Sequence, residues 1–134
     1  ASFLMNIQEL STIKQYRLPV KVFILNNKYL GMVRQWQEFF HGGRYSESYT
    51  DSLPDFVRLA EAYGIKGLRA ERPSELSIVI KEMISYKGPV IADICVDEKE
   101  NVFPMIPSGA AHNQMKLKDD DNVATTTKEG KMLV

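Results

Sequence analysis

Apolar residues recur at two different spacings along the chain, and the two spacings predict alternating helices and strands. Between residues 4 and 16 apolar positions return at three-residue steps with polar residues between them, which is typical of an amphipathic helix. The apolar run 22–25, within the segment 20–27, and the mostly apolar segment 90–96 predict strands buried on both faces, and the segment 65–70 is a candidate for a shorter strand. The chain therefore alternates between helical and extended patterns at short intervals.

Three further helices are predicted from apolar stripes and from residues that favour helix ends. One is predicted over 31–40. Ser52 and Asp55 resemble a capping box at the start of the next helix, and Gly64 suits its carboxyl-terminal cap. Pro73 suits the first turn of a last helix, whose apolar stripe continues to residue 84.

Strands and helices that alternate in this way predict an α/β fold with a parallel sheet flanked by helices. Three strands are few for a sheet covered on both faces, so we expect further strands upstream, in a larger domain. Residues 1–115 are expected to belong to the folded domain. Residues 116–134 are polar, and we expect them to form a flexible tail.

Charge and cysteine content exclude several classes of protein. Lysine plus arginine and aspartate plus glutamate number 17 each, so bulk charge favours neither nucleic acid nor a membrane surface as a partner. No apolar run approaches the roughly 20 residues that cross a bilayer. The single cysteine, Cys95, cannot form an internal disulfide, which indicates a reducing compartment. We expect a bacterial-type cytoplasm, with an organelle as the alternative.

The end of the first strand carries candidate binding chemistry. Ligands of open parallel sheets bind beyond the carboxyl ends of the strands, where Asn26 and Asn27 lie. An asparagine side chain offers a neutral oxygen, and magnesium combines a few protein oxygens with phosphate oxygens. Gly31 lets the backbone approach a ligand at the start of a helix, which favours anions. This stretch predicts a magnesium-diphosphate site; the alternative is a simple turn.

The amino terminus carries a second indication of phosphate binding. Ala1 and Ser2 are small residues directly before a helix, where backbone amides can contact a phosphate. The thiamine-diphosphate enzymes share a motif that begins Gly-Asp-Gly or Gly-Asp-Ala and closes with Asn-Asn, at a spacing that Ala1 and Asn26-Asn27 reproduce. Ala1 resembles the third residue of the opening. The resemblance implies that the glycine and the metal-binding aspartate lie just before it.

Longer stretches narrow this resemblance to one family. The large catalytic subunit of the acetolactate (acetohydroxyacid) synthases is similar to the segments ASFLMNIQEL, PVKVFILNN, LGMVRQWQEFF, GGRYS, PDFVRLAEAYGIKGLR and FPMIPSG. The similarity runs as far as Gly109. It implies that residues 1–115 are the carboxyl-terminal part of a thiamine-diphosphate-binding domain.

The resemblance also implies roles for individual residues near the cofactor. Asn27 corresponds to the side-chain ligand of magnesium, and Tyr29 corresponds to the residue whose backbone carbonyl binds the same ion. Two further pairs correspond to positions beside the cofactor: Ala1 with Ser2 at the diphosphate, and Gly31 with Met32 at the turn toward the diphosphate and thiazolium.

A substrate pocket is implied by Val33 and Trp36, together with Met32. In the family these positions line the pocket that also binds inhibitory herbicides. All three fall within about one turn of the predicted helix, near its amino terminus. The alternative is that they are simply core residues.

Four residues with reactive side chains are assigned no catalytic role. His41 is a lone loop histidine, typically solvated, and His112 has less support still. Cys95 is expected to pack within its strand. Asp93 interrupts the same strand, and we expect it to have a hydrogen-bonding partner because a buried carboxylate needs one.

For the whole enzyme the resemblance implies decarboxylation of pyruvate and condensation with a second 2-oxo acid, pyruvate or 2-oxobutyrate, in branched-chain amino-acid biosynthesis. It implies FAD, a homo-oligomer (dimer or tetramer) with its active site at the subunit interface, and a regulatory small subunit. The activating glutamate comes from a partner subunit, so we expect no catalytic residue in this chain and no activity from it alone. The alternatives are another thiamine-diphosphate-dependent carboligase, decarboxylase or oxidase, and a non-catalytic α/β binding module.

Overall fold

The computed structural model of the chain describes residues 2–119, and these divide into two compact units. The first unit contains residues 2–28 and 50–98, and the second contains 29–49 and 99–119. In chain order the elements are η1 (Ser2–Asn6), α1 (Glu9–Gln15), β1 (Lys21–Asn26), α2 (Gly31–Phe40), α3 (Phe56–Ala62), β2 (Lys66–Ala70), α4 (Pro73–Ser85), β3 (Val90–Cys95) and η2 (His112–Gln114). Ala1 and most of the predicted tail lie outside the described residues.

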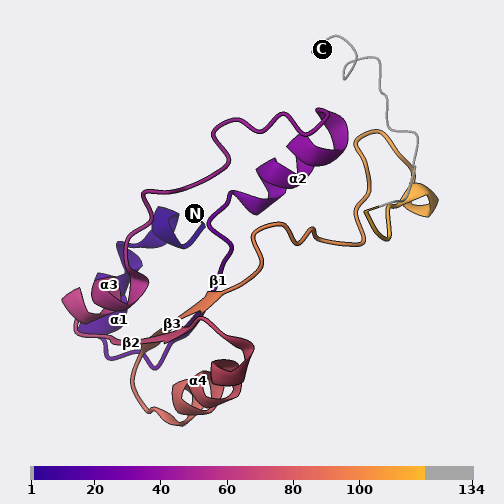
Figure 1. Ribbon diagram of the computed structural model, residues 1–134. Helices are drawn as coiled ribbons and strands as arrows, with labels where there is room; N and C mark the ends of the chain where they lie inside the picture. Colours follow the sequence, from indigo (N-terminus) through magenta and orange to yellow (C-terminus); the bar gives the residue numbers. More distant parts are fainter. Residues whose placement is uncertain (1, 120–134) are drawn as a thin grey trace. The chain divides into compact units, whose positions relative to one another are not determined.

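A three-stranded parallel sheet forms the centre of the first unit, which confirms the predicted α/β fold (Figure 1). The strand order is β1-β3-β2, so the last strand in the sequence lies in the middle and pairs with both others. Lys21 of β1 and Lys66 of β2 both lie opposite Val90 of β3. The three carboxyl ends therefore meet at one edge of the sheet.

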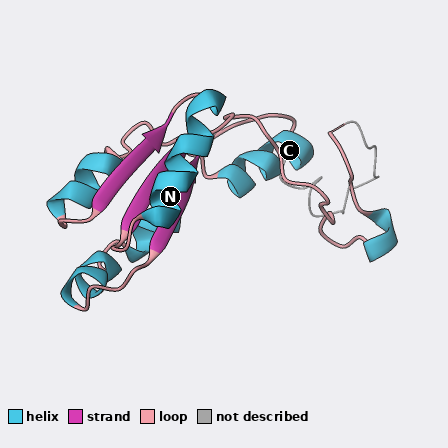
Figure 2. Ribbon diagram, turned by 90° about the horizontal axis from the view of Figure 1, so that it is seen from below, coloured by secondary structure: helices cyan, strands magenta, loops and turns pink. Residues whose placement is uncertain are grey.

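β3 supplies the hydrophobic core on both faces of the sheet, because its side chains point alternately to either side. Val90, Ala92 and Ile94 pack with α4, whereas Ile91 packs with α1 and α3. These four side chains are at most 5% exposed. Helices accordingly cover both faces (Figures 1 and 2). This double burial explains why the strand reads as a continuous apolar run rather than an alternating one.

The helix predicted over residues 4–16 is divided in the structure into η1 and α1. The amides of Leu10 and Ser11 donate to the carbonyls of Ile7 and Gln8, each at 3.1 Å, so the backbone winds tightly between the two pieces. Such 3-10 turns are frequent at the amino ends of α-helices. The apolar stripe still reaches the core, since Leu10 is 1% exposed.

The ends of α3 follow the local sequence signals. Asp55 is its N-cap and accepts hydrogen bonds from the amides of Val57 and Arg58 at 2.9 and 3.1 Å. The N-cap is therefore Asp55, and not Ser52, which the predicted capping box placed at the start of this helix. Gly64 follows the last turn with φ of +63°, the left-handed conformation that glycine adopts at low cost.

Cys95 does not pack within the sheet as predicted; it is exposed. It is the last residue of β3, whose five preceding residues are all buried. The strand therefore leaves the cover of the helices at this position, and the side chain lies at the carboxyl edge instead of in the core.

The second unit is built around α2, whose buried side chains are polar. Gln35 is 1% exposed, and its amide both donates to the carbonyl of Val102 at 3.0 Å and accepts from its N–H at 2.8 Å. Arg34 is 7% exposed and forms an ion pair with Glu38 at 2.8 Å. These contacts fix which side of α2 faces the rest of its unit.

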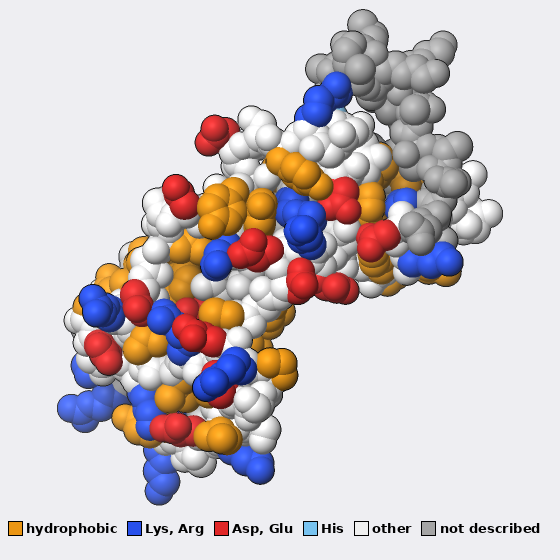
Figure 3. Space-filling view, viewed as in Figure 1, with side chains coloured by type: hydrophobic (Ala, Val, Ile, Leu, Met, Phe, Trp, Pro, Cys, Tyr) orange, Lys and Arg blue, Asp and Glu red, His pale blue; other side chains and the backbone are white. Residues whose placement is uncertain are grey.

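The surface carries both signs of charge. On the face shown in Figure 3, lysine and arginine side chains are interspersed with aspartate and glutamate side chains, in keeping with their equal numbers. Among the described residues, every helix is too short or too polar to span a lipid bilayer.

Gly67 allows β2 and α3 to approach closely. A Cβ atom added there would lie 2.9 Å from the Cα atom and the carbonyl oxygen of Val57, which are backbone atoms. We expect Gly67→Ala to lower the free energy of unfolding by about 1–3 kcal/mol, because strand and helix must separate. Urea-induced unfolding measures this loss. As a control, Gly88→Ala meets the flexible Tyr86 ring instead and should cost less; an equal loss would contradict the prediction.

Candidate functional site

The turn that follows β1 is held by hydrogen bonds on both sides. The backbone carbonyl of Asn26 accepts from Val96 at 3.2 Å, which extends the pairing with β3 to the last residue of the strand. Lys28 has φ of +59°, and its carbonyl accepts from the amide and the hydroxyl of Thr50 at 2.8 and 2.6 Å. Asn27 therefore lies between two anchored residues.

The side chain of Asn26 bridges this turn to the central strand. Its Nδ2 donates to Oδ1 of Asp93 at 2.9 Å, and its Oδ1 accepts from the amide of Lys28 at 3.2 Å. The second contact is an Asx-type turn, in which a side chain replaces a backbone acceptor. Both hydrogen-bonding ends of the Asn26 amide are therefore occupied within the first unit.

Asp93 is the buried carboxylate of the site, at 2% exposure, and partners on both neighbouring strands hold it. Nε of Arg69, from β2, donates to its Oδ2 at 3.1 Å, while the guanidinium also pairs with Asp55 at 2.9 Å. Burial disfavours the charge on Arg69, but hydrogen bonds to Asp55 and Asp93 outweigh it and raise the pKa of Arg69. The partner predicted for Asp93 is thus confirmed.

The first described residues pack against the start of α3. Ser2 starts η1, and the ring of the next residue, Phe3, contacts the ring of Phe56 edge-on at 5.8 Å. Phe56 is the first residue of α3, directly after Asp55. Ser2, a predicted diphosphate position, therefore directly precedes a residue that packs on α3, whereas Ala1 lies outside the described residues.

The start of α2 carries Gly31 and Met32, the other positions predicted to lie beside the cofactor. The helix follows Leu30, which has no side-chain cap hydrogen bond to offer. The amides of a first helical turn have no partner within the helix, and they favour an anion. An uncapped start at a glycine therefore fits a bound diphosphate.

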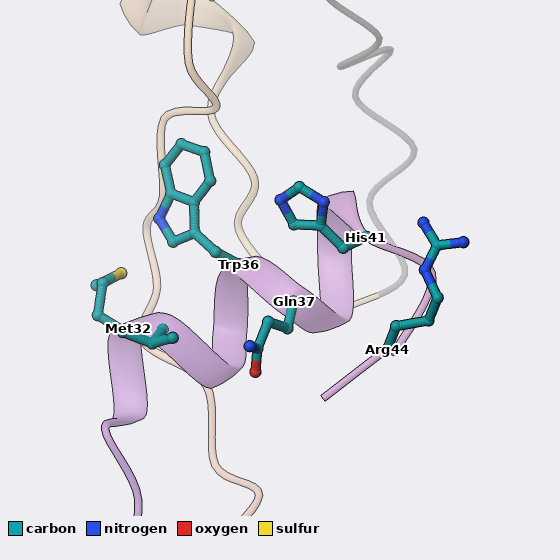
Figure 4. Close-up of a pocket in the computed structure, with 6 residues that line it drawn as sticks. Met32, Trp36, Gln37, His41 and Arg44 are labelled. Carbon is teal, nitrogen blue, oxygen red and sulfur yellow. The ribbon is translucent and has the colours of Figure 1, made fainter. Parts of the chain in front are cut away.

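A pocket of about 530 Å³ lies along α2 within the second unit (Figure 4). Met32, Val33 and Trp36 line it together, and Met32 and Trp36 project from the same side of the helix. Met32 and Val33 are 52% and 45% exposed, so they are not core residues. Trp36 is supported by the ring of Phe40 at 4.8 Å.

Three polar residues that the sequence left without a role also line this pocket: Gln37, His41 and Arg44. They lie on the last turns of α2 and on the loop after it (Figure 4). The pocket therefore combines apolar walls with a cationic guanidinium, a combination that suits a small organic anion. The signal available in the sequence was the short distance of His41 and Arg44 from the end of an amphipathic helix.

A magnesium ion at this turn would need oxygen ligands other than acidic side chains. The described residues contain no cluster of three or more His, Cys, Asp or Glu that could hold a metal. The side-chain oxygen of Asn27 and the backbone oxygen of Tyr29 are neutral, hard donors. Magnesium accepts such donors when phosphate oxygens complete its shell. The donor set fits a magnesium-diphosphate group better than a bare ion.

Comparison with known proteins identifies relatives of the chain. The sequence profile "Thiamine pyrophosphate enzyme, C-terminal TPP binding domain" matches residues 1–94. The acetolactate synthase large subunit of Haemophilus influenzae is 50% identical over 117 residues, which is 87% of this chain and 20% of that protein. The mitochondrial acetolactate synthase of Schizosaccharomyces pombe is 46% identical over 119 residues, covering 89% and 18%.

A solved structure has a similar fold. The thiamine diphosphate-dependent 4-hydroxybenzoylformate decarboxylase of Rhodococcus jostii RHA1 aligns with a TM-score of 0.66 and 25% identity, over 74% of this chain and 19% of that one. The chain spans about a fifth of the length of the curated relatives it matches. These relatives include bacterial and mitochondrial proteins.

The charge of Asp55 should make the first unit sensitive to acid. Hydrogen bonding from the Arg58 amide, and then from Arg69, outweighs desolvation and lowers the pKa of Asp55 below the unfolded value of about 3.9. Its stabilising contribution is therefore full above that value and is lost as pH falls through the folded pKa. We expect Asp55→Asn, which keeps a capping side chain, to weaken this acid dependence.

Urea midpoints measured from neutral pH down to about pH 3 test this expectation. Wild-type chain should exceed Asp55→Asn in stability near neutral pH, and the difference should shrink in acid. Asp51→Asn makes the same charge change at a nearby exposed position and serves as the control. A wild-type advantage that grows on acidification would contradict the assigned direction.

Proposed function

Because the chain belongs to the thiamine pyrophosphate enzyme family, through its C-terminal TPP-binding domain, we propose that it is part of an acetolactate synthase large subunit. The whole enzyme then decarboxylates pyruvate and condenses the two-carbon unit with pyruvate or 2-oxobutyrate. The observation that carries this proposal is 50% identity to an acetolactate synthase over 87% of the chain. The 25% identity to a decarboxylase is weaker support for the alternative of a related thiamine-diphosphate enzyme.

Magnesium is held in this proposal by the side-chain oxygen of Asn27 and the backbone carbonyl of Tyr29. The turn supports the first role, because Asn26 and Lys28 on either side of Asn27 are both hydrogen-bonded. Neutral oxygens are ligands that magnesium accepts together with phosphate. The remaining charge would come from the diphosphate and from the aspartate that the family motif places before Ala1.

The residues that we propose as contacts of thiamine diphosphate are Ala1, Ser2, Gly31 and Met32. Backbone amides at the uncapped start of α2 are suited to its diphosphate. When bound, the cofactor supplies the electron sink that decarboxylation of a 2-oxo acid requires. The residues of this chain bind and orient it; none of them is proposed as an acid or base, since the activating glutamate belongs to a partner subunit.

The pocket on α2 would receive the 2-oxo acid. Met32, Val33 and Trp36 offer apolar walls for its alkyl group and exclude water from the reacting carbon. Arg44 provides a permanent positive charge on the same pocket, to which the substrate carboxylate can bind. Apolar walls beside one cation match the chemistry of a short 2-oxo acid.

The family implies further components for the whole enzyme. We propose FAD as a second cofactor, a dimer or tetramer with the active site at the subunit interface, and a regulatory small subunit. In the part of the chain that the structure describes, no position is assigned to FAD. These components therefore come from the family alone and not from the contacts described above.

The activity of the whole enzyme can be tested directly. We expect the native polypeptide that carries this chain to convert pyruvate to acetolactate only when both thiamine diphosphate and magnesium are present. The 134-residue chain alone, supplied with the same cofactors, should show no turnover because it lacks the partner's glutamate. Product analysis distinguishes an acetolactate synthase from a decarboxylase, because acetaldehyde instead of acetolactate would favour the decarboxylase. Turnover by the 134-residue chain alone would contradict the proposal that the activating glutamate comes from a partner subunit.

Trp36→Ala removes the largest apolar wall of the pocket. We expect KM for the 2-oxo acid to rise about tenfold, corresponding to about 1.4 kcal/mol of binding, with a smaller change in kcat. Trp36→Phe keeps an aromatic wall and should lie between this variant and wild type. Tyr16→Ala removes an aromatic ring that is 66% exposed in the other unit and should leave KM unchanged. Unchanged KM in Trp36→Ala would contradict the pocket assignment.

A further inference from the structure

One carboxylate links all three strands at the carboxyl edge of the sheet. Asp93 lies in the central strand, opposite Arg69 of β2 in the register. Its Oδ2 accepts from Arg69 at 3.1 Å, and its Oδ1 accepts from Asn26 at the end of β1 at 2.9 Å. The carboxylate is 2% exposed, so these protein groups replace the water that an exposed carboxylate would bind.

The chemistry of this carboxylate dictates how the Asn26 amide is turned. An ionised carboxylate only accepts hydrogen bonds, so Asn26 must present its NH2 group to Asp93. Its carbonyl oxygen then faces the opposite way, where it accepts from the amide of Lys28 at 3.2 Å. If the amide were turned over, carbonyl oxygen would face carboxylate and NH2 would face N–H. Both contacts would then be repulsive.

The turn that depends on this amide has a backbone conformation that most residues avoid. Lys28 has φ of +59°, which is unfavourable for a residue with a Cβ atom. The hydrogen bond from Asn26 and the two bonds from Thr50 to the Lys28 carbonyl hold it there. Asn27 lies between Asn26, whose side chain contacts Asp93, and Lys28, whose amide contacts the Asn26 side chain.

We propose that Asp93 is a positioning residue: its buried carboxylate sets the orientation of the Asn26 amide and so fixes the turn that presents Asn27 to magnesium. The inference rests on the proposed function, because it assigns a consequence to magnesium binding at Asn27. Asp93 itself touches neither metal nor substrate in this arrangement. It acts through the side chain of Asn26 and the turn formed by residues 26–28.

Asp93→Asn tests the orientation because an amide cannot accept on both sides. If the new amide keeps its oxygen toward the Arg69 guanidinium, its NH2 group faces Asn26. The Asn26 amide must then turn over to accept, and it no longer accepts from Lys28. Combining Asn26→Asp with Asp93→Asn restores a complementary set. The carboxylate introduced in β1 then accepts from both the new amide in β3 and the Lys28 amide, while the oxygen of the new amide still accepts from Arg69.

The experiment measures magnesium affinity in the native polypeptide that carries this chain, by titration with Mg²⁺ at saturating thiamine diphosphate. Outer-shell partners of a metal ligand typically contribute 10–100-fold in affinity, so we expect Asp93→Asn to raise the Kd for Mg²⁺ at least about tenfold. Hydrogen exchange of the Lys28 amide, measured without metal or cofactor, should also become faster. The double variant should return that exchange toward the wild-type rate.

Two further variants separate positioning from charge and from stability. Asn26→Ala keeps the Asp93 charge and its pair with Arg69 but removes the amide, and it should weaken Mg²⁺ binding as Asp93→Asn does. It also keeps the test decisive if Asp93→Asn fails to fold. Asp55→Asn disturbs the same guanidinium without touching Asn26 and should leave the Kd for Mg²⁺ unchanged.

The outcomes are distinguishable. Wild-type affinity in Asn26→Ala or Asp93→Asn, with wild-type protein binding Mg²⁺ normally, would overturn the positioning role alone. Equal weakening in Asp55→Asn would indicate a general loss of stability and would also overturn it. Wild-type protein that binds no Mg²⁺ in the presence of thiamine diphosphate would instead overturn the proposed function on which the inference rests.

Discussion

The buried carboxylate of Asp93 is the interaction on which the carboxyl edge of the sheet depends. A charge removed from water and left without partners costs on the order of 3–5 kcal/mol, so the strands on either side must bring groups that satisfy it. Arg69 and Asn26 do so from opposite neighbours. Strand order, strand register and the orientation of the Asn26 amide are therefore coupled. The turn that carries Asn27 is held through the same hydrogen bonds.

The same strand organises the core, because its remaining side chains are divided between the two faces of the sheet. Val90, Ala92 and Ile94 bind α4 to one face, and Ile91 binds α1 and α3 to the other. A strand buried on both sides cannot accept a charged residue in its middle without matched partners. The polar edge is thus compatible with an apolar strand only because the neighbouring strands supply those partners.

α2 reverses the usual distribution of polar and apolar side chains. Gln35 is buried and bonded to the backbone of Val102, and Arg34 is buried beside Glu38, while Met32 and Val33 face outward along a pocket. Anchoring a helix by polar side chains leaves its apolar residues available for a ligand. The pocket along α2 therefore has apolar walls although the buried side chains of the helix are polar.

The sequence alone determined the features that depend on neighbouring residues. The apolar segments specified the strands, and Asp55 and Gly64 specified the ends of α3. Only the tertiary structure decided the contacts between residues far apart: Asn26 meets Asp93, and Gln35 meets Val102, each across 67 positions. Local signals record backbone preferences and periodicity. The partner of a buried polar group is set by strand order and packing, which no local stretch of sequence encodes.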